Sequence, residues 1–202
     1  MKYKCITGGP ISENCYLLID EKTNQAAVVD PGFLNDVLLN EIKKYTVQRI
    51  LLTHGHFDHI WEADRLHEML GVPVCAYETE AAFAADDKQN GSLLMMYESI
   101  TCKVHEAFKD GEIFQIGEVP VTVLHTPGHT AGGVSYITPD AVFTGDTLMG
   151  YSVGRCDLPT GNSAELRESL KKLAALPGNP DICGGHGPVT TLENEKRRNP
   201  YL

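Results

Sequence analysis

The residues best suited to chemistry lie in one short segment, 53–59, which reads Thr-His-Gly-His-Phe-Asp-His. In an extended chain, side chains two positions apart point to the same side, so His54 and His56 can bind one cation. Asp58 and His59 begin the helix predicted to follow, and their side chains turn toward a second position beside the first. The segment therefore predicts a metal site, and its spacing favours a pair of cations.

Three more residues of ligand type occur later in the chain: His129, Asp146 and His186. Each follows a predicted strand and a turn that contains glycine. Ligands carried by the carboxyl ends of separate strands converge in one cleft, so we expect all of them to join the first segment. Taken alone, each would more simply be a hydrogen-bonded histidine or a turn aspartate. The remaining histidines are predicted to have surface or structural roles: His67, His105 and His125.

The elements that must position these residues follow from the apolar pattern. Strands are predicted at 15–19, 26–29, 50–52, within 113–137, at 141–144 and, as the last one, at 181–183. Helices are predicted over 34–45, over 60–70 with a stop at Gly71, and from Asn162 to Pro177; 77–99 is helical but irregular. Strands dominate, which indicates a sheet core covered by helices and a single domain over 1–202.

Composition narrows the class of protein. A chain of 202 residues buries a sufficient core without disulfides, and six cysteines without a Cys-x-x-Cys pair favour reduced thiols. The net charge of -10 argues against a nucleic acid partner, which needs clustered Lys and Arg. No leader is recognisable, and no apolar run reaches the roughly 20 residues of a spanning helix. We expect a cytoplasmic protein with a small-molecule partner and no membrane partner.

The pattern His-x-His-x-Asp-His at 54–59, followed by separate His, Asp and His residues, resembles the metallo-β-lactamase superfamily over nearly the whole chain. The resemblance implies an α/β (α+β) fold, a four-layer αββα sandwich. It also implies these ligands: His54, His56 and His129 for one cation, Asp58, His59 and His186 for the other, and Asp146 as the bridge. The superfamily often has an Asp-Pro-Gly turn like that at Asp30, whose carboxylate is then expected to orient a ligand histidine. A simple turn aspartate is the alternative.

Two further elements narrow the resemblance. Gly154-Arg155-Cys156-Asp157 and the stretch 186–202 are similar to the short relatives of hydroxyacylglutathione hydrolases (glyoxalase II). This implies hydrolysis of a thioester of the S-lactoylglutathione type, by a hydroxide held between two divalent cations with the help of Asp58 and Asp146. Zinc is favoured for this ligand set, and iron and manganese also fit. Arg155 either pairs with Asp157 or meets a substrate carboxylate, the pairing being preferred, and Cys156 is expected to be inert.

Alternatives remain open at this point. Larger glyoxalase II enzymes continue into a helical domain that binds glutathione, whereas this sequence ends at Leu202, so the thiol of the substrate is open. A persulfide dioxygenase looks similar but holds one iron with the counterparts of His54, His129 and Asp146. A metal-binding regulatory protein without turnover is a third reading. The acidic charge argues against a nuclease, and the Gly-Arg-x-Asp element argues against a lactonase. The lack of a recognisable leader argues against a true β-lactamase.

Overall fold

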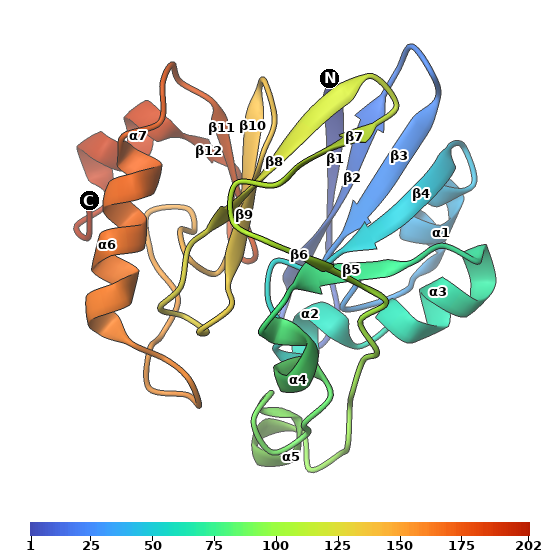
Figure 1. Cartoon of the computed structure of the whole chain (residues 1–202), viewed down its shortest axis with the longest axis horizontal. Coiled ribbons are helices and arrows are strands. Elements are labelled where there is room, and N and C mark those ends of the chain that lie inside the picture. Colours follow the sequence, from blue (N-terminus) through green and yellow to red (C-terminus); the bar gives the residue numbers. More distant parts are fainter.

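The computed structural model describes residues 1–202 as two six-stranded sheets packed face to face (Figure 1). The first sheet contains, in chain order, β1 (Lys2–Gly8), β2 (Glu13–Asp20), β3 (Gln25–Val29), β4 (Thr46–Leu51), β5 (Val74–Tyr77) and β6 (Glu106–Phe108). The second contains, from edge to edge, β12 (Thr190–Thr191), β11 (Asp181–Gly184), β10 (Ala141–Gly145), β9 (Val134–Ile137), β8 (Val119–His125) and β7 (Ile113–Ile116). Both sheets mix parallel and antiparallel pairs.

Helices flank the two sheets (Figure 1). On the side of the first sheet lie α1 (Asp36–Ile42), α2 (Phe57–Ile60) and α3 (Ala63–Leu70). On the side of the second lie α6 (Ser163–Ala174) and α7 (Leu192–Arg198). Two short helices, α4 (Glu80–Ala84) and α5 (Ser92–Met95), lie at one end of the molecule. This order of helix, sheet, sheet and helix confirms the predicted αββα sandwich.

Strand β2 shows why the fold has these layers. All its residues are buried, and successive side chains point to opposite faces of the sheet. Leu17 and Ile19 join the apolar cluster beneath the flanking helices, whereas Tyr16 and Leu18 join the cluster between the sheets. A third apolar cluster joins the second sheet to the leucine stripe of α6. A strand that is apolar on both faces needs cover on both, and each buried leucine or isoleucine contributes about 1.5–3 kcal/mol.

The parallel strand pairs bring the residues of ligand type to one edge. In the first sheet, parallel strands β3 and β4 end just before Asp30 and Thr53. In the second sheet, parallel strands β10 and β11 end just before Asp146 and the glycines that precede His186. Because the carboxyl ends of parallel strands meet at the same edge, segments far apart in sequence become neighbours there.

Five elements were not predicted from the sequence. Asp181–Cys183 is not the last strand, because β12 and α7 follow it, and the predicted opening pair of strands is a set of three that begins with β1. Strands β5 and β6 are also additional. Helix α7 buries only Leu192 and Glu195, so it shows no apolar stripe, and β12 is two residues long.

The predicted helices are present with shifted bounds. The pattern over 60–70 is divided between α2 and α3, and α3 ends at Gly71 in the left-handed conformation that favours glycine. The irregular segment 77–99 contains α4 and α5. Asn162 caps α6 as predicted, because its side chain accepts hydrogen bonds from the amides of Ala164 and Glu165.

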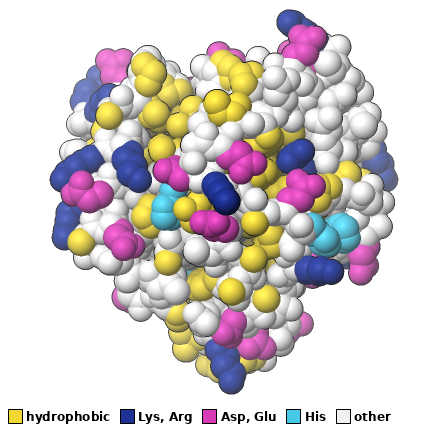
Figure 2. Space-filling view, in the orientation of Figure 1, with side chains coloured by type: hydrophobic (Ala, Val, Ile, Leu, Met, Phe, Trp, Pro, Cys, Tyr) yellow, Lys and Arg dark blue, Asp and Glu magenta, His cyan; other side chains and the backbone are white.

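Charged and apolar side chains are distributed unevenly over the surface. Figure 2 shows acidic and basic side chains interspersed on one face, with apolar side chains on the projection that carries α5. Leu94 of α5 is 65% exposed and the neighbouring Tyr97 is 90% exposed. All six cysteines are free. No helix combines the length and apolar character needed to cross a bilayer.

Candidate metal centre

The first trio of predicted ligands comes from two loops. His54 and His56 follow β4, and His129 follows β8 in the other sheet. All three are buried, and their candidate ligand atoms lie within 4.8 Å of one another. His56 Nδ1 and His129 Nε2 are 2.8 Å apart. The structure thus brings together the residues that the resemblance assigned to one cation.

The second trio lies beside the first. Asp58 and His59 belong to α2, and His186 follows β11. Asp58 Oδ2 lies 3.2 Å from His186 Nε2 and 3.3 Å from His59 Nε2. The ligand atoms of this trio also lie within 4.8 Å of one another. These residues match the second predicted set.

Asp146 lies between the two trios. Its Oδ2 is 3.6 Å from His129 Nε2, a member of the first trio. Its Oδ1 is 3.6 Å from His59 Nε2, and its Oδ2 is 3.7 Å from His186 Nε2, both members of the second trio. A carboxylate that faces both sets through its two oxygens has the position expected of a bridging ligand.

Hydrogen bonds at the far ring nitrogens orient three of the histidines. Thr53 Oγ1 donates to Asp30 Oδ2 at 2.6 Å, so the hydroxyl is left to accept from His54 Nδ1 at 3.1 Å. The same Asp30 oxygen lies 3.0 Å from His59 Nδ1. His129 Nδ1 lies 2.7 Å from the backbone oxygen of Arg155, to which it donates. Each bond fixes the tautomer in which Nε2 is free to bind a metal.

Asp30 therefore acts on both trios. It contacts His59 of the second directly and reaches His54 of the first through Thr53, whose amide also donates to Asp30 Oδ1 at 2.7 Å. Asp30 is 2% exposed and lies in the left-handed region, with φ 51°. The residue occupies the place in which the sequence predicted a partner of a ligand histidine.

The centre fits cations. His54 Nε2, His59 Nε2 and Asp146 Oδ1 are buried without any hydrogen-bond partner. Burial and the neighbouring imidazoles hold the pKa of His54 well below its usual value, so that ring is neutral and presents a lone pair. Burial opposes ionisation of Asp58, but His59 and His186 outweigh it and hold its pKa well below the usual range. Divalent metals need neutral imidazoles and ionised carboxylates, and the pKa shifts of His54 and Asp58 favour these forms.

Close packing leaves no room for side chains at two loop glycines. A Cβ atom on Gly185 would lie 2.2 Å from Asp146 Oδ1, and one on Gly32 would lie 1.4 Å from the backbone oxygen of Asp58. Both distances are far below contact distance. The absence of a side chain at these positions lets the loops that carry His186 and Asp30 approach the ligands.

Two residues of β2 hold the His186 loop and were not predicted from the sequence. Asn14 Nδ2 donates to the backbone oxygens of Gly184 at 3.0 Å and Gly187 at 2.9 Å. The Tyr16 hydroxyl donates to Gly184 at 2.7 Å. These bonds tie the first sheet to a loop of the second. Asn14 and Tyr16 lie in a segment that reads as an ordinary buried strand, so only the fold reveals their role.

Glu80 is the other residue that the sequence did not indicate. It is 2% exposed, and its Oε2 accepts from the amide of Gly55, between His54 and His56, at 2.8 Å. Its Oε1 accepts from the amide of Gly132 in the loop after His129, also at 2.8 Å. One carboxylate therefore fastens both loops that carry the first trio. Its partners lie 25 and 52 residues away, which no local pattern can signal.

Replacing Glu80 by alanine is expected to weaken metal binding at the first trio by about 10–100-fold, because oriented ligands depend on such support. Two buried amides also lose their acceptor, at about 1–3 kcal/mol each. Competition with a chromogenic chelator measures the affinity. The affinity of Glu80→Gln should lie between those of the wild type and Glu80→Ala, since an amide has one acceptor oxygen. The matched control is Glu78→Ala, because Glu78 is exposed. Wild-type affinity in Glu80→Ala would show that the clamp is dispensable.

A cleft opens onto the ligands. It has a volume of about 220 Å³, and besides ligands it is lined by Ile11, Phe57, Met95, Met149, Gly154, Arg155 and Leu158. Arg155 forms the predicted bidentate pair with Asp157, at 2.6 and 2.7 Å, and both side chains are more than half exposed. Burial raises the pKa of the Cys156 thiol, so nothing activates it. The cleft is thus apolar, with one guanidinium at its rim.

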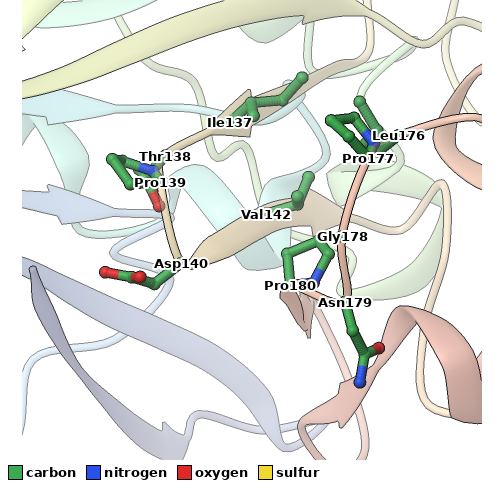
Figure 3. Close-up of a pocket in the computed structure, with 10 residues that line it drawn as sticks. All are labelled: Ile137, Thr138, Pro139, Asp140, Val142, Leu176, Pro177, Gly178, Asn179 and Pro180. Atoms are coloured by element: carbon green, nitrogen blue, oxygen red, sulfur yellow. The ribbon is translucent and has the colours of Figure 1, made fainter.

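A different cavity, shown in Figure 3, lies at the opposite end of the second sheet. Its volume is about 380 Å³, and it lies between the β9–β10 turn and the loop before β11. Its one ionisable lining residue, Asp140, pairs with the amino group of Met1 at 3.3 Å. Because Asp146 and His186 follow the carboxyl ends of these strands, the cavity is separate from the metal centre.

Comparisons with known proteins agree with this geometry. Residues 8–186 match the family model described as the metallo-beta-lactamase superfamily. The chain is 38% identical over 209 residues to the probable metallo-hydrolase YqgX of Bacillus subtilis, covering 100% of this chain and 98% of that protein. It is 32% identical over 209 residues to hydroxyacylglutathione hydrolase GloC of Haemophilus influenzae, with coverage of 100% and 98%.

Solved structures share the fold along the whole chain. The BLEG-1 B3 metallo-beta-lactamase superposes with a TM-score of 0.93 at 34% identity, covering 100% of this chain and 99% of that one. TTHA1623 in a di-iron-bound form superposes with a TM-score of 0.84 at 34% identity, covering 98% of this chain and 100% of that one. ETHE1 from Myxococcus xanthus gives 0.81 at 30% identity, with coverage of 99% and 84%. The fold is common to these proteins, and BLEG-1 is named for a β-lactamase activity.

Proposed function

The chain belongs to the metallo-beta-lactamase superfamily, and from this premise we propose that it hydrolyses a small-molecule thioester of the S-lactoylglutathione type. The observation that carries the proposal is the cluster of two ligand trios with Asp146 between them. Similarity to hydroxyacylglutathione hydrolase GloC over the full chain supports a thioester as the substrate.

In this proposal each trio would hold one divalent cation, and Asp146, which lies between the trios, would be available to both. The cations supply a nucleophilic water at neutral pH and polarise the thioester carbonyl. Zinc is favoured, and iron or manganese also accept a mixed set of imidazoles and carboxylates. The similar protein TTHA1623 is known in a di-iron-bound form, which supports iron as the second choice.

The chain's own groups have distinct tasks in the reaction. Water adds to the carbonyl carbon, the carbon–sulfur bond breaks, and a carboxylic acid and a thiol are released. Asp58 Oδ2 faces His59 and His186, which leaves Oδ1 to orient the attacking water. The apolar cleft walls, including Phe57 and Met149, receive the acyl group, which a volume of about 220 Å³ restricts to a small one.

A second candidate function has its own support. ETHE1 from Myxococcus xanthus shares the fold at 30% identity. A persulfide dioxygenase would hold one iron with His54, His129 and Asp146, since two histidines and a carboxylate with open positions suit ferrous iron. In that case Asp58, His59 and His186 would hold no metal.

The test begins with protein purified anaerobically, without chelator or affinity nickel. Mass spectrometry is expected to find about two ions per chain, and S-lactoylglutathione is expected to be hydrolysed with kcat above about 1 s⁻¹. One iron per chain, with oxygen consumed in the presence of glutathione persulfide, would favour the dioxygenase. A metal-loaded protein inert toward both substrates would favour a regulatory role. A chromogenic β-lactam tests the activity for which BLEG-1 is named.

A further inference from the structure

A second cavity adjoins the catalytic cleft and has no role in the function proposed so far. Its volume is about 570 Å³, and its walls are the segment 153–156, helix α6 and the C-terminal residues 200–201. We call it the α6 cavity. Gly154 and Arg155 line both it and the cleft, so the two spaces meet at this dipeptide.

The dipeptide forms a thin partition against the metal ligands. On the cleft side, the backbone oxygen of Arg155 accepts from His129 at 2.7 Å, and the amide of Gly154 donates to the backbone oxygen of Asp146 at 2.7 Å. A Cβ atom on Gly154 would lie only 2.6 Å from His129 Nδ1. The Arg155 side chain is exposed and lines both spaces, so a molecule that lies over it can extend from the α6 cavity to the cleft.

The lining of the α6 cavity selects for an anion on an apolar arm. Leu166 and Leu170 of α6 are 5% and 3% exposed and form an apolar floor. The charged residues that line the cavity are both arginines, Arg155 and Arg167, in a chain whose net charge is -10. Arg155 already pairs with Asp157, whereas Arg167, an exposed residue of α6, forms no ion pair. Arg167 is thus available to a carboxylate or phosphate.

We propose that the α6 cavity binds the thiol half of the substrate, an anionic low-molecular-weight thiol whose carboxylate or phosphate pairs with Arg167. This inference rests on the proposed thioester hydrolysis, and it supplies the recognition of the thiol that the catalytic cleft, with its small volume, lacks. The acyl group lies in the cleft, the arm of the thiol passes Arg155, and its anionic end lies against α6.

The kinetic test uses one acyl group on three thiols: glutathione, which carries carboxylates, coenzyme A, which carries phosphates, and neutral N-acetylcysteamine. Arg167→Gln is expected to raise KM about tenfold for the anionic thioester that the protein prefers, the size of one charge-assisted contact, with kcat unchanged. KM for the neutral thioester should not change. Lys171→Gln, on the same helix outside the cavity, is the matched control. An equal KM effect on all thioesters, or none, overturns the proposal.

A binding measurement tests the cavity without turnover. Cys156 lines the cavity, whereas Cys5 is exposed elsewhere on the chain and serves as an internal reference. S-methylglutathione or S-methyl-coenzyme A, which cannot react with the alkylating reagent, is expected to protect Cys156 but not Cys5 from iodoacetamide in peptide mapping. Arg167→Gln should remove the protection. If neither compound protects Cys156, the α6 cavity is not the binding site.

Different results would reject the proposed thioester hydrolysis and the proposed role of the α6 cavity. If the wild-type protein turns over no thioester, the proposed function fails. If it hydrolyses thioesters but Cys156 stays reactive and Arg167→Gln behaves as wild type, only the α6 cavity is rejected.

Discussion

Replacing Asp58 by alanine is expected to lower kcat for thioester hydrolysis by at least about 10³-fold, or roughly 4 kcal/mol of transition-state stabilisation. Asp58 is buried, faces His59 and His186, and lies in α2 at the start of the second trio. Its loss removes both a ligand of the second cation and the group that orients water. The number of ions per chain should fall from about two to about one, measured by mass spectrometry on the same preparation.

The controls separate lost chemistry from lost structure. Asp36→Ala changes an exposed aspartate of α1 and should leave kcat and the metal count unchanged. Circular dichroism checks that the Asp58 variant is folded. A kcat near the wild-type value would refute the role of Asp58. A single iron in both wild type and variant, with oxygen consumption retained, would instead favour the dioxygenase.

The metal ligands were predictable because each has a local signal. His54, His56, Asp58 and His59 share one short segment, and strand periodicity alone places the first two on one side. His129, Asp146 and His186 each follow an apolar strand and a glycine turn. Parallel strands then carry these signals to a common edge, so the predicted cluster and the observed one agree.

The supporting residues were not predictable because their partners are remote in sequence. Glu80 acts on amides in two other loops, and Asn14 of the first sheet holds a loop of the second. Asp30 was found only because its turn resembles that of a known family. Helix α7 and strand β1 were missed for a different reason. Helix α7 is polar along most of its length, and β1 is an edge strand in which no residue is fully buried. Neither shows the apolar periodicity from which elements are predicted.

Removal of the metal ions is expected to lower the midpoint of thermal unfolding by about 10–20 °C. Each ion at a concentration about 100 times its Kd stabilises the folded chain by about 2.7 kcal/mol, so two ions contribute about 5 kcal/mol. One kcal/mol corresponds to about 2–4 °C for a chain of this size. Without ions, His54 Nε2, His59 Nε2 and Asp146 Oδ1 stay buried without a hydrogen-bond partner, which adds to the loss. Scanning calorimetry before and after dialysis against EDTA measures the shift.

The part of the metal-dependent shift in unfolding temperature that each variant retains distinguishes one metal site from two. If both trios bind, Asp58→Ala should keep roughly half of the metal-dependent shift, because the first trio still holds its ion. His56→Ala should likewise keep roughly half, through the second trio. His67→Ala changes a histidine that stacks on His105 at 3.9 Å, outside the centre, and should keep all of the shift. If Asp58→Ala keeps the full metal-dependent shift and His56→Ala shows none, only the first trio binds metal. That result would refute the dinuclear mechanism.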